Sequence, residues 1–224
     1  MSIASGLSDA WHRLMEDGAS DHASKWWTKI GTAYGEPHRA YHTLEHLELM
    51  YALYQRHHAA LHITSMERVF VLAIAFHDIV YDPLSKTNEV DSISVFRQFM
   101  AESPCKVATP SEAALVEAMI EATIRHQLPP LSAILPDTAH HHIGCFLDLD
   151  LAILGQSSPM YGVYSAQIRQ EYIAYSDADF CNGRAAVLRA FLGRDTLYFT
   201  HTFQDIAEKV ARANVSAELE RLTR

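Results

Sequence analysis

Residues 69–82 read VFVLAIAFHDIVYD, an apolar run that ends with a histidine and an aspartate side by side, His77 and Asp78. Residues 69–76 are apolar on every face, so we expect the helix they form to be surrounded by protein. An unpaired carboxylate in such a place costs several kcal/mol, and a partner charge or a metal ion is the usual remedy. Alone, the pair is better explained by a neighbouring arginine and a backbone carbonyl. It indicates a metal site only if other ligand residues converge on it.

Apolar residues recur at helical spacing along almost the whole chain, and no segment alternates convincingly with period two, which predicts an all-α fold. The 224 residues suit one domain, residues 1–224, built as a helical bundle around the central buried helix that carries His77 and Asp78. Helices are expected at about residues 7–15, 23–34, 41–58, 64–82, 88–100, 110–127, 143–154, 161–176, 183–192 and 202–221.

Two segments have the form of a capping box, in which an N-terminal hydroxyl accepts an amide of the first turn and a glutamate reaches back. Thr64 and Glu67 would open the central helix, and Thr109 and Glu112 would open the helix that precedes a proline-bounded segment. That segment, residues 131–142, is predicted to be a surface loop, with a flexible lid as the less favoured interpretation.

The composition excludes several classes of protein. The formal net charge is -9 and no long basic run occurs, so a nucleic-acid duplex is not an expected partner, whereas a small phosphate ester needs only a few local arginines. The three cysteines have no C-x-x-C spacing, which argues against disulfides or a thiolate zinc site and favours a reducing compartment. No secretory signal and no apolar run of the ~20 residues that span a membrane is visible, so we expect a cytoplasmic protein without a membrane partner.

Further ligand-type residues lie outside the central helix. His42 and His46 are four residues apart in the third expected helix, so they would share one face. Residues 146–154, FLDLDLAIL, embed Asp148 and Asp150 in an apolar helix, where the two side chains point about 200° apart and at most one reaches a common centre directly. Imidazoles and carboxylates without a thiolate suit a divalent ion such as Mn, Fe, Zn or Mg, which can lower the pKa of a bound water to about 7 for hydrolysis.

The segments RAYHTLEHLELM, AIAFHDIVYDP, NEVDS, ATIRH, FLDLDLAILG and IRQEY follow one another in this order from about Arg39 onward. Their combination resembles a bacterial group in the HD superfamily that is described as predicted metal-dependent phosphohydrolases. Each short motif is common, whereas the ordered set is specific. The resemblance implies an HD-type helical domain, a divalent metal cofactor and hydrolysis of a phosphate ester by metal-activated water.

The resemblance also implies roles for individual residues. The implied metal ligands are His46, His77, Asp78 and Asp150, with Asp148 and His126 as less favoured ligands. Asp150 is preferred to Asp148 because many relatives carry D-x-D here with the second aspartate as the ligand. His126 could also hold a second metal, as extra histidines do in some HD proteins.

The implied catalytic residues are His42, Asp78 and Asp82. In cyclic-nucleotide phosphodiesterases, a distant HD branch, the first histidine of Tyr-His-Asn-x-x-His protonates the leaving group. Residues 41–46 match this motif except for Thr43, which makes His42 the candidate general acid. Alarmone hydrolases carry His-Asp-x-x-Glu-Asp, and here Tyr81 replaces the glutamate. This replacement argues against alarmone hydrolysis and leaves Asp82 as a candidate water-orienting base.

Substrate contacts are expected from polar side chains around this set. The candidates are Arg39, Arg125, Arg169, Arg184, His126 and Glu89. A guanidinium binds two phosphate oxygens at once, and Arg169 is the first choice for a substrate contact, although a structural ion pair with Glu171 is the favoured interpretation of this arginine. His126 is equally well explained as a helix-end histidine, and Glu89 as a first-turn carboxylate that complements the helix dipole.

The sequence therefore predicts an enzyme, a metal-dependent phosphohydrolase of a small phosphorylated compound, with a nucleotide as the expected substrate. A module that binds metal and nucleotide without turnover is the alternative from another class. A di-iron oxygenase is the least favoured, because it requires His126 or another residue to complete a second metal site. No motif indicates the base or sugar of the substrate, or the oligomeric state.

Overall fold

The computed structural model describes residues 6–15, 20–103, 107–130 and 137–224, and over these ranges the protein is helical and contains no β-strand. The predicted all-α class is confirmed. The elements are α1 (Leu7–Met15), α2 (Ser20–Tyr34), α3 (Leu44–His57), η1 (Thr64–Met66), α4 (Glu67–Phe76), α5 (Asn88–Glu102), α6 (Pro110–Thr123), α7 (Asp137–Asp150), η2 (Leu151–Gly155), α8 (Ser158–Glu171), α9 (Asp177–Leu192) and α10 (His201–Leu222). Among the described residues, no helix is both long and apolar enough to cross a lipid bilayer.

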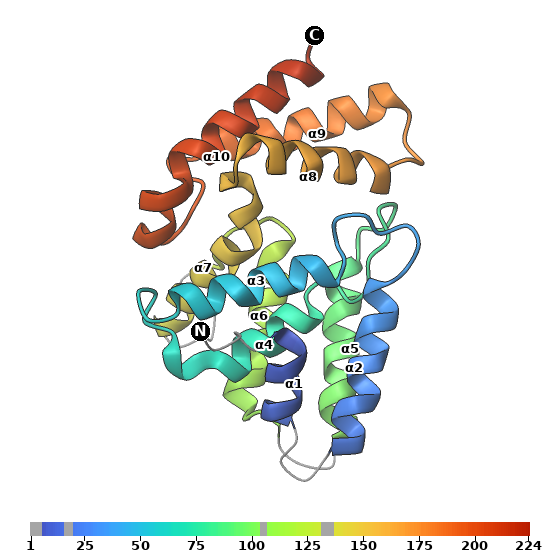
Figure 1. Ribbon diagram of the computed structural model, residues 1–224, viewed down its shortest axis with the longest axis vertical. Helices are drawn as coiled ribbons and strands as arrows, with labels where there is room; N and C mark the ends of the chain where they lie inside the picture. The colour runs from blue at the N-terminus through green and yellow to red at the C-terminus, as the bar shows by residue number, and fades with distance from the viewer. Residues whose placement is uncertain (1–5, 16–19, 104–106, 131–136) are drawn as a thin grey trace.

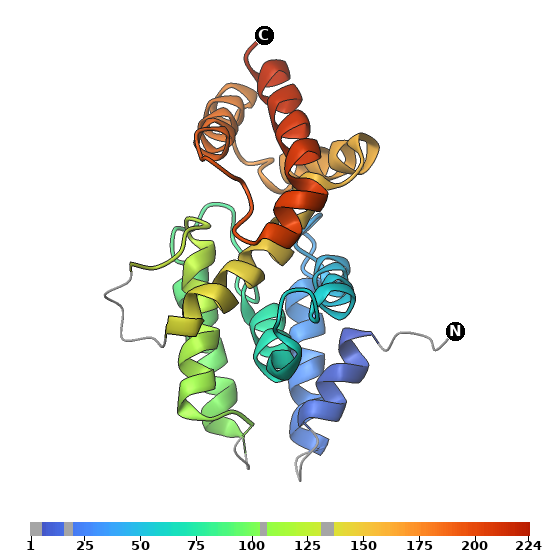
Figure 2. The same cartoon turned by 90° about the vertical axis from the view of Figure 1, so that its left-hand side faces the viewer.

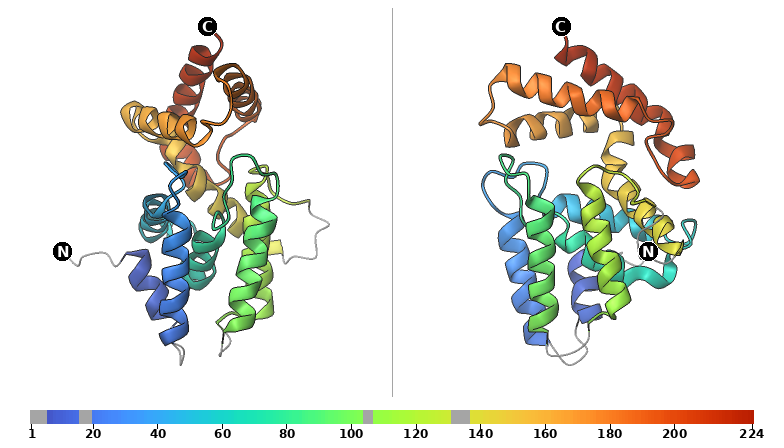
Figure 3. Two further views of the ribbon diagram at one scale, coloured as in Figure 1. Left: turned by 90° about the vertical axis from the view of Figure 1, so that its right-hand side faces the viewer. Right: turned by 180° about the vertical axis from the view of Figure 1, so that it is seen from behind.

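The helices form two groups that α7 connects. Helices α1 to α6 stand together at one end of the molecule, and α8, α9 and α10 lie at the other end with the C-terminus (Figure 1). Views from the sides and from behind show the same division (Figure 2, Figure 3). The continuation of α7, the 3₁₀ helix η2, packs against α8 and α10. Two loops, residues 35–43 and 77–87, extend from the first group toward α8 (Figure 1).

Helix α4 is the centre of the first group. Every residue from 69 to 76 is buried, and the helix contacts α1, α3, α5 and α6, so no face of residues 69–76 is left to water. The rings of Trp11, Trp26, Phe76 and Phe99 pack together with centroids 5.2 to 6.0 Å apart. Burying each such ring stabilises the fold by about 1.5–3 kcal/mol or more. This packing holds the C-terminal end of α4, and with it the residue that follows, in a fixed position.

Helix α4 ends at Phe76, earlier than the sequence predicts. The carbonyl oxygens of Asp78 and Ile79 would accept amides four residues further on in a continuing helix. They accept the Arg39 guanidinium instead, at 2.8 and 3.1 Å. A buried arginine from the loop before α3 therefore replaces the last helical turn.

One of the two predicted capping boxes forms. At α6, the Thr109 hydroxyl accepts the Glu112 amide, and the Glu112 carboxylate accepts the Thr109 amide. At Thr64 the prediction is wrong, because this residue begins a short 3₁₀ helix and makes no side-chain cap. Glu67 bonds instead to Arg13 of α1 and to a tyrosine hydroxyl of α3. Tertiary partners have displaced the local bond.

Three other boundaries differ from the prediction and bear on the site. Thr43 is the N-cap of α3, so His42 lies in the loop before the helix and not on its face. His126 lies in the turn beyond α6 with φ of 46°, in the left-handed region. Helix α7 begins at Asp137, inside the segment predicted to be irregular, of which residues 131–136 lie outside the described residues.

Candidate metal centre

Three side chains converge where α3, α4 and α7 meet. His46 lies in the first turn of α3, His77 caps α4, and Asp150 is the last residue of α7. His46 Nε2 is 3.3 Å from His77 Nε2 and 3.1 Å from Asp150 Oδ1, and His77 Nε2 is 3.8 Å from the same oxygen. Over the described part of the chain, these residues form the one group of His, Cys, Asp and Glu donors that could hold a metal ion.

The donor separations fit coordination of one ion. Ligand atoms about 2.1 Å from a shared ion lie about 3.0 Å apart at right angles and about 3.4 Å apart at tetrahedral angles. The observed separations of 3.1, 3.3 and 3.8 Å are close to these values. Two imidazoles and a carboxylate suit Mn, Fe or Zn, and Mg less well, and leave positions for water. The residues present therefore fit a divalent metal ion.

Hydrogen bonding orients the ring of His77 for this purpose. Its Nδ1 donates to the carbonyl of Ile74 at 3.0 Å, so Nε2, which faces the other donors, is the nitrogen that would bind a metal on losing its proton. Burial lowers the pKa of His77, but the carboxylates of Asp78 and Asp150 outweigh burial and raise the pKa to about 9. His46, by contrast, has a lowered pKa because its burial dominates. The carboxylates of Asp78 and Asp150, whose side chains are 15% and 12% exposed, require positive charge here, which a divalent ion would supply.

Asp150 is held by a fourth residue. His126 Nε2 lies 3.0 Å from Asp150 Oδ2, which leaves Oδ1 to face His46 and His77. Burial raises the pKa of Asp150, but its contacts with His126, His46 and His77 lower the pKa well below its ordinary range. Asp150 is therefore ionised, and His126 occupies the place of an outer partner that orients a ligand.

Asp148, two residues earlier, points elsewhere. Its Oδ1 accepts the Phe199 amide at 2.7 Å, and its Oδ2 accepts the Thr200 amide and hydroxyl at 2.8 and 2.6 Å. Burial raises the pKa of Asp148 to about 7, although these donors act in the opposite direction. The carboxylate of Asp148 thus anchors the segment that begins α10, and Asp150 is the aspartate that the structure brings to the two histidines.

Asp78 lies at the edge of the donor group, beside His42. Asp78 Oδ2 is 3.1 Å from His77 Nε2 and 3.8 Å from His42 Nε2. Burial raises the pKa of Asp78, but His77 and His42 lower it well below its ordinary range, so the carboxylate is ionised. Asp78 is therefore placed to complete a ligand set or to accept a hydrogen bond from a water beside it.

Glu171, at the end of α8, holds His42. Its Oε2 accepts His42 Nδ1 at 2.7 Å and the Tyr81 hydroxyl at 2.8 Å, and its Oε1 accepts the backbone amides of residues 40, 41 and 42 at 2.8, 2.8 and 2.9 Å. Burial raises the pKa of Glu171, but the contacts with His42 and these amides lower it to about 2. Burial likewise lowers the pKa of His42, and the carboxylates of Glu171 and Asp78 raise it overall.

The sequence interpretation missed this role of Glu171, although a signal was present. Tyr161, Tyr164, Ile168 and Glu171 recur at helical spacing and all four are buried. A glutamate at a core position of an amphipathic helix requires buried donors. The alternative of an ion pair between Glu171 and Arg169 is wrong, since the two residues bond to different partners.

Two of the predicted site residues, Arg39 and Asp82, bond to other parts of the chain. The Arg39 side chain is fully buried, and its guanidinium donates to Glu36 and to the carbonyls of residues 42, 78 and 79, so it ties the two site loops together and has no surface for a substrate. Asp82 is exposed, and its Oδ1 accepts the amide of Leu84 in a turn. The prediction that Asp82 orients the attacking water is therefore not supported by its position. Glu89 is half-buried, and its pKa is raised by burial and by the charge of Asp78, which places it near the site.

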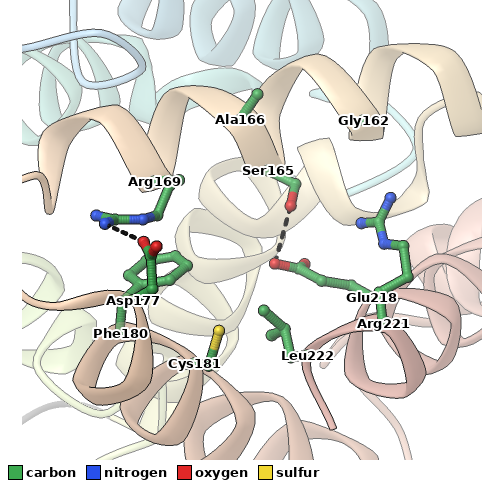
Figure 4. Close-up of a pocket in the computed structure, with 10 residues that line it drawn as sticks. All are labelled: Gly162, Ser165, Ala166, Arg169, Asp177, Phe180, Cys181, Glu218, Arg221 and Leu222. Carbon is green, nitrogen blue, oxygen red and sulfur yellow. Dashed lines mark hydrogen bonds and ion pairs between the residues drawn. The ribbon is translucent and has the colours of Figure 1, made fainter. Parts of the chain in front are cut away.

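The other predicted phosphate-binding arginines have structural partners. Arg169 donates to Asp177 at 2.6 Å and lines a cavity of about 320 Å³ between α8, α9 and α10 (Figure 4). Arg184 bonds to the buried Glu218, which also accepts the hydroxyl of Ser165. Arg125 is exposed in the turn after α6. None of the three is placed against the donor group by a described contact.

Comparisons with protein-family models, with curated proteins and with solved structures found no match to this chain.

Proposed function

We propose that the protein is a metal-dependent phosphohydrolase of the HD type, which acts on a small phosphate ester with a nucleotide as the first candidate. The buried donor group of His46, His77 and Asp150 carries this proposal. Asp78 and the imidazole of His42 lie next to that group, where hydrolysis needs an acceptor and a donor of protons. The ordered motifs between residues 39 and 171 support the same class.

The residues of the site would have different roles in hydrolysis. His46, His77 and Asp150 would hold the ion, with Asp78 as a further ligand, and a divalent ion bound there would make a water acidic enough to attack phosphorus at neutral pH. If Asp78 is not a ligand, its carboxylate is placed to accept a hydrogen bond from the attacking water and to orient it. His42 donates a proton to the departing oxygen through Nε2, the nitrogen that faces Asp78. Asp82 has no part in this scheme because it lies in an exposed turn.

Metal analysis followed by a substrate panel tests the proposal. Protein purified without added metal should carry about one divalent ion per chain, and with Mn, Mg, Fe or Zn it should release phosphate from a member of a nucleotide and phosphoester panel. His77→Ala and Asp78→Ala should lower the rate at least ~10²-fold, the lower end of what a positioned catalytic group contributes. His57→Ala is the matched control, since His57 is half-buried on α3 and packs on Phe203, away from the donor group. Unchanged hydrolysis in both site variants would refute the assignment.

Binding of metal and nucleotide without turnover is the second candidate. The position of Asp82 favours it, because the second carboxylate expected to orient water is absent from the described site. A sensor would be stabilised by nucleotides, since binding to the native state raises the melting temperature, and would release no phosphate with any metal or member of the panel.

A further inference from the structure

The two carboxylate oxygens of Glu171 have different partners. Oε1 receives three backbone amides of residues 40–42, which is sufficient to fix the loop before α3. Oε2 accepts hydrogen bonds from the ring nitrogen Nδ1 of His42 and from the hydroxyl of Tyr81. The second oxygen therefore acts on the imidazole itself and not on the path of the backbone.

These contacts leave the His42 ring one orientation. Because Nδ1 is bonded to Glu171 at 2.7 Å, Nε2 is the nitrogen that faces the candidate ligand Asp78. The ring packs against Tyr81 with centroids 4.3 Å apart, and 19% of the side chain of His42 remains exposed. The ring is therefore partly open to solvent, and turning it over would break the bond to a buried carboxylate.

We propose that Glu171 is a positioning residue that presents the Nε2–H of His42 to the leaving oxygen, and that the substrates are phosphate esters of alcohols. This inference rests on the proposed phosphohydrolase function and deepens it. Glu171 acts through His42 and touches no reacting atom, so it is not itself a catalytic residue.

The step balances as an ester hydrolysis. Water supplies the oxygen that bonds to phosphorus, and the bond between phosphorus and the alcohol oxygen breaks with its electron pair on that oxygen. The step starts from the His42 imidazolium, which keeps its Nδ1 proton hydrogen-bonded to Glu171 and passes its Nε2 proton to the alcohol oxygen. The neutral imidazole then regains a proton from the attacking water by way of solvent. The products are the free alcohol and the phosphate with one ester bond fewer.

The substrate class follows from the need for an acid. An alkoxide is a poor leaving group, because an alcohol holds its proton about as strongly as water, with a pKa near 15.7 for water. A phosphate released from a pyrophosphate bond has a second pKa of about 6 and leaves without protonation. A site in which a buried carboxylate orients a proton donor is therefore suited to cleaving the bond between phosphorus and an alcohol oxygen.

Leaving-group dependence tests the inference. Glu171→Gln preserves the shape and the amide-accepting oxygen, but places an NH₂ group against His42 Nδ1 and the Tyr81 hydroxyl. With an alkyl phosphate ester we expect kcat to fall about 10²-fold at unchanged KM, the lower end of a general acid's contribution. With the p-nitrophenyl ester, whose anion leaves unaided, we expect a fall of less than about 10-fold. Glu208→Gln is the matched control, since Glu208 also accepts backbone amides, those of residues 197 and 198, and touches none of the site residues.

A second measurement needs neither metal nor activity. In metal-free wild-type protein, proton NMR should show a downfield, slowly exchanging Nδ1–H resonance that disappears in His42→Asn. This resonance should be lost in Glu171→Gln and retained in Glu208→Gln. Because the spectra of wild type and His42→Asn together report the bond, the inference stays testable if Glu171→Gln fails to fold.

The possible results distinguish a failure of this inference from a failure of the proposed phosphohydrolase function. Equal losses of kcat on alkyl and aryl esters, or a His42 ring whose Nδ1 carries no proton, would overturn the role of Glu171 and leave the phosphohydrolase intact. Hydrolysis of pyrophosphate bonds but not of alcohol esters would overturn the substrate class alone. A protein that binds metal and hydrolyses none of these compounds would overturn both.

Discussion

Asp148 and Asp150 offer a matched pair of substitutions that separates metal binding from stability. Both lie in the last turn of α7, yet Asp150 faces His46 and His77 while Asp148 bonds to the segment that begins α10. We expect Asp150→Asn to abolish metal binding in a folded protein. We expect Asp148→Asn to lower the stability and to retain the metal.

The structure sets the size of both effects. Asparagine at position 148 keeps one acceptor, so the amide and hydroxyl of Thr200 lose the oxygen that now receives them at 2.8 and 2.6 Å. A buried donor without a partner costs about 1–3 kcal/mol, so we expect a loss of about 3 kcal/mol in the free energy of unfolding, or about 6–12 °C in the melting temperature. Loss of an outer partner of a metal ligand lowers affinity about 10–100-fold, so loss of the charged ligand Asp150 should lower it by more than about 100-fold.

Elemental analysis and thermal denaturation with and without added Mn or Zn measure the two effects together. Wild type and Asp148→Asn should both be stabilised by the metal, and Asp150→Asn should not respond. If Asp148→Asn loses the ion and Asp150→Asn keeps it, the donor group has been misassigned.

Three further predictions concern stability. Thr109→Ala should lower the free energy of unfolding, measured by chemical denaturation, by about 1 kcal/mol because it removes a formed helix cap, whereas Thr64→Ala removes no cap and should lower it clearly less. Equal losses in the two variants would contradict the caps described. Burial raises the pKa of Glu218, but Arg184 lowers it overall, so the stabilisation that the ionised Glu218 gives the fold is present above pH ~4.5 and is lost as the pH falls through the lowered pKa. Glu218→Gln should therefore be less stable than wild type at pH 7 and should lose less stability on acidification. Parallel curves of stability against pH for the two proteins would refute this. Gly155→Ala should cost about 1–3 kcal/mol, seen as a lower urea midpoint, because the added Cβ would lie 2.6 Å from a Cβ of α10, and a neutral effect would show that α10 can move away.

The sequence predicts the helical class and the central helix because both depend on local pattern. Residues 69–76 have no polar face, and that alone places α4 at the centre. The end of α4 depends on Arg39, which is some forty positions earlier and is indistinguishable in sequence from a surface arginine in a polar loop. Thr64 and Thr109 head the same capping motif, and only the tertiary partners of Glu67 distinguish them.

The sequence predicted three residues that the structure brings together, His46, His77 and Asp150, but it did not predict the residues that hold them in place. His46 and His77 stand at anomalous positions that the sequence displays, and the structure brings them together with Asp150. The choice between Asp148 and Asp150 depends on the amide and hydroxyl of Thr200, about fifty residues later, which no local pattern reveals. Asp82 was assigned by motif alone, and the turn after α4 directs it to solvent.

The bonds of Glu171 also bear on the order in which the chain assembles. Glu171 accepts hydrogen bonds from amides that lie 129 to 131 positions earlier in the chain. Contacts between residues so far apart form late in folding, because the chain loses the entropy of closing the loop before the contact stabilises it. A growing chain that has released residues 46, 77 and 150 from the ribosome still lacks the carboxylate that orients His42. We therefore expect His46, His77 and Asp150 to come together before the ring of His42 is oriented, because that orientation requires α8 to dock on the loops of the first group.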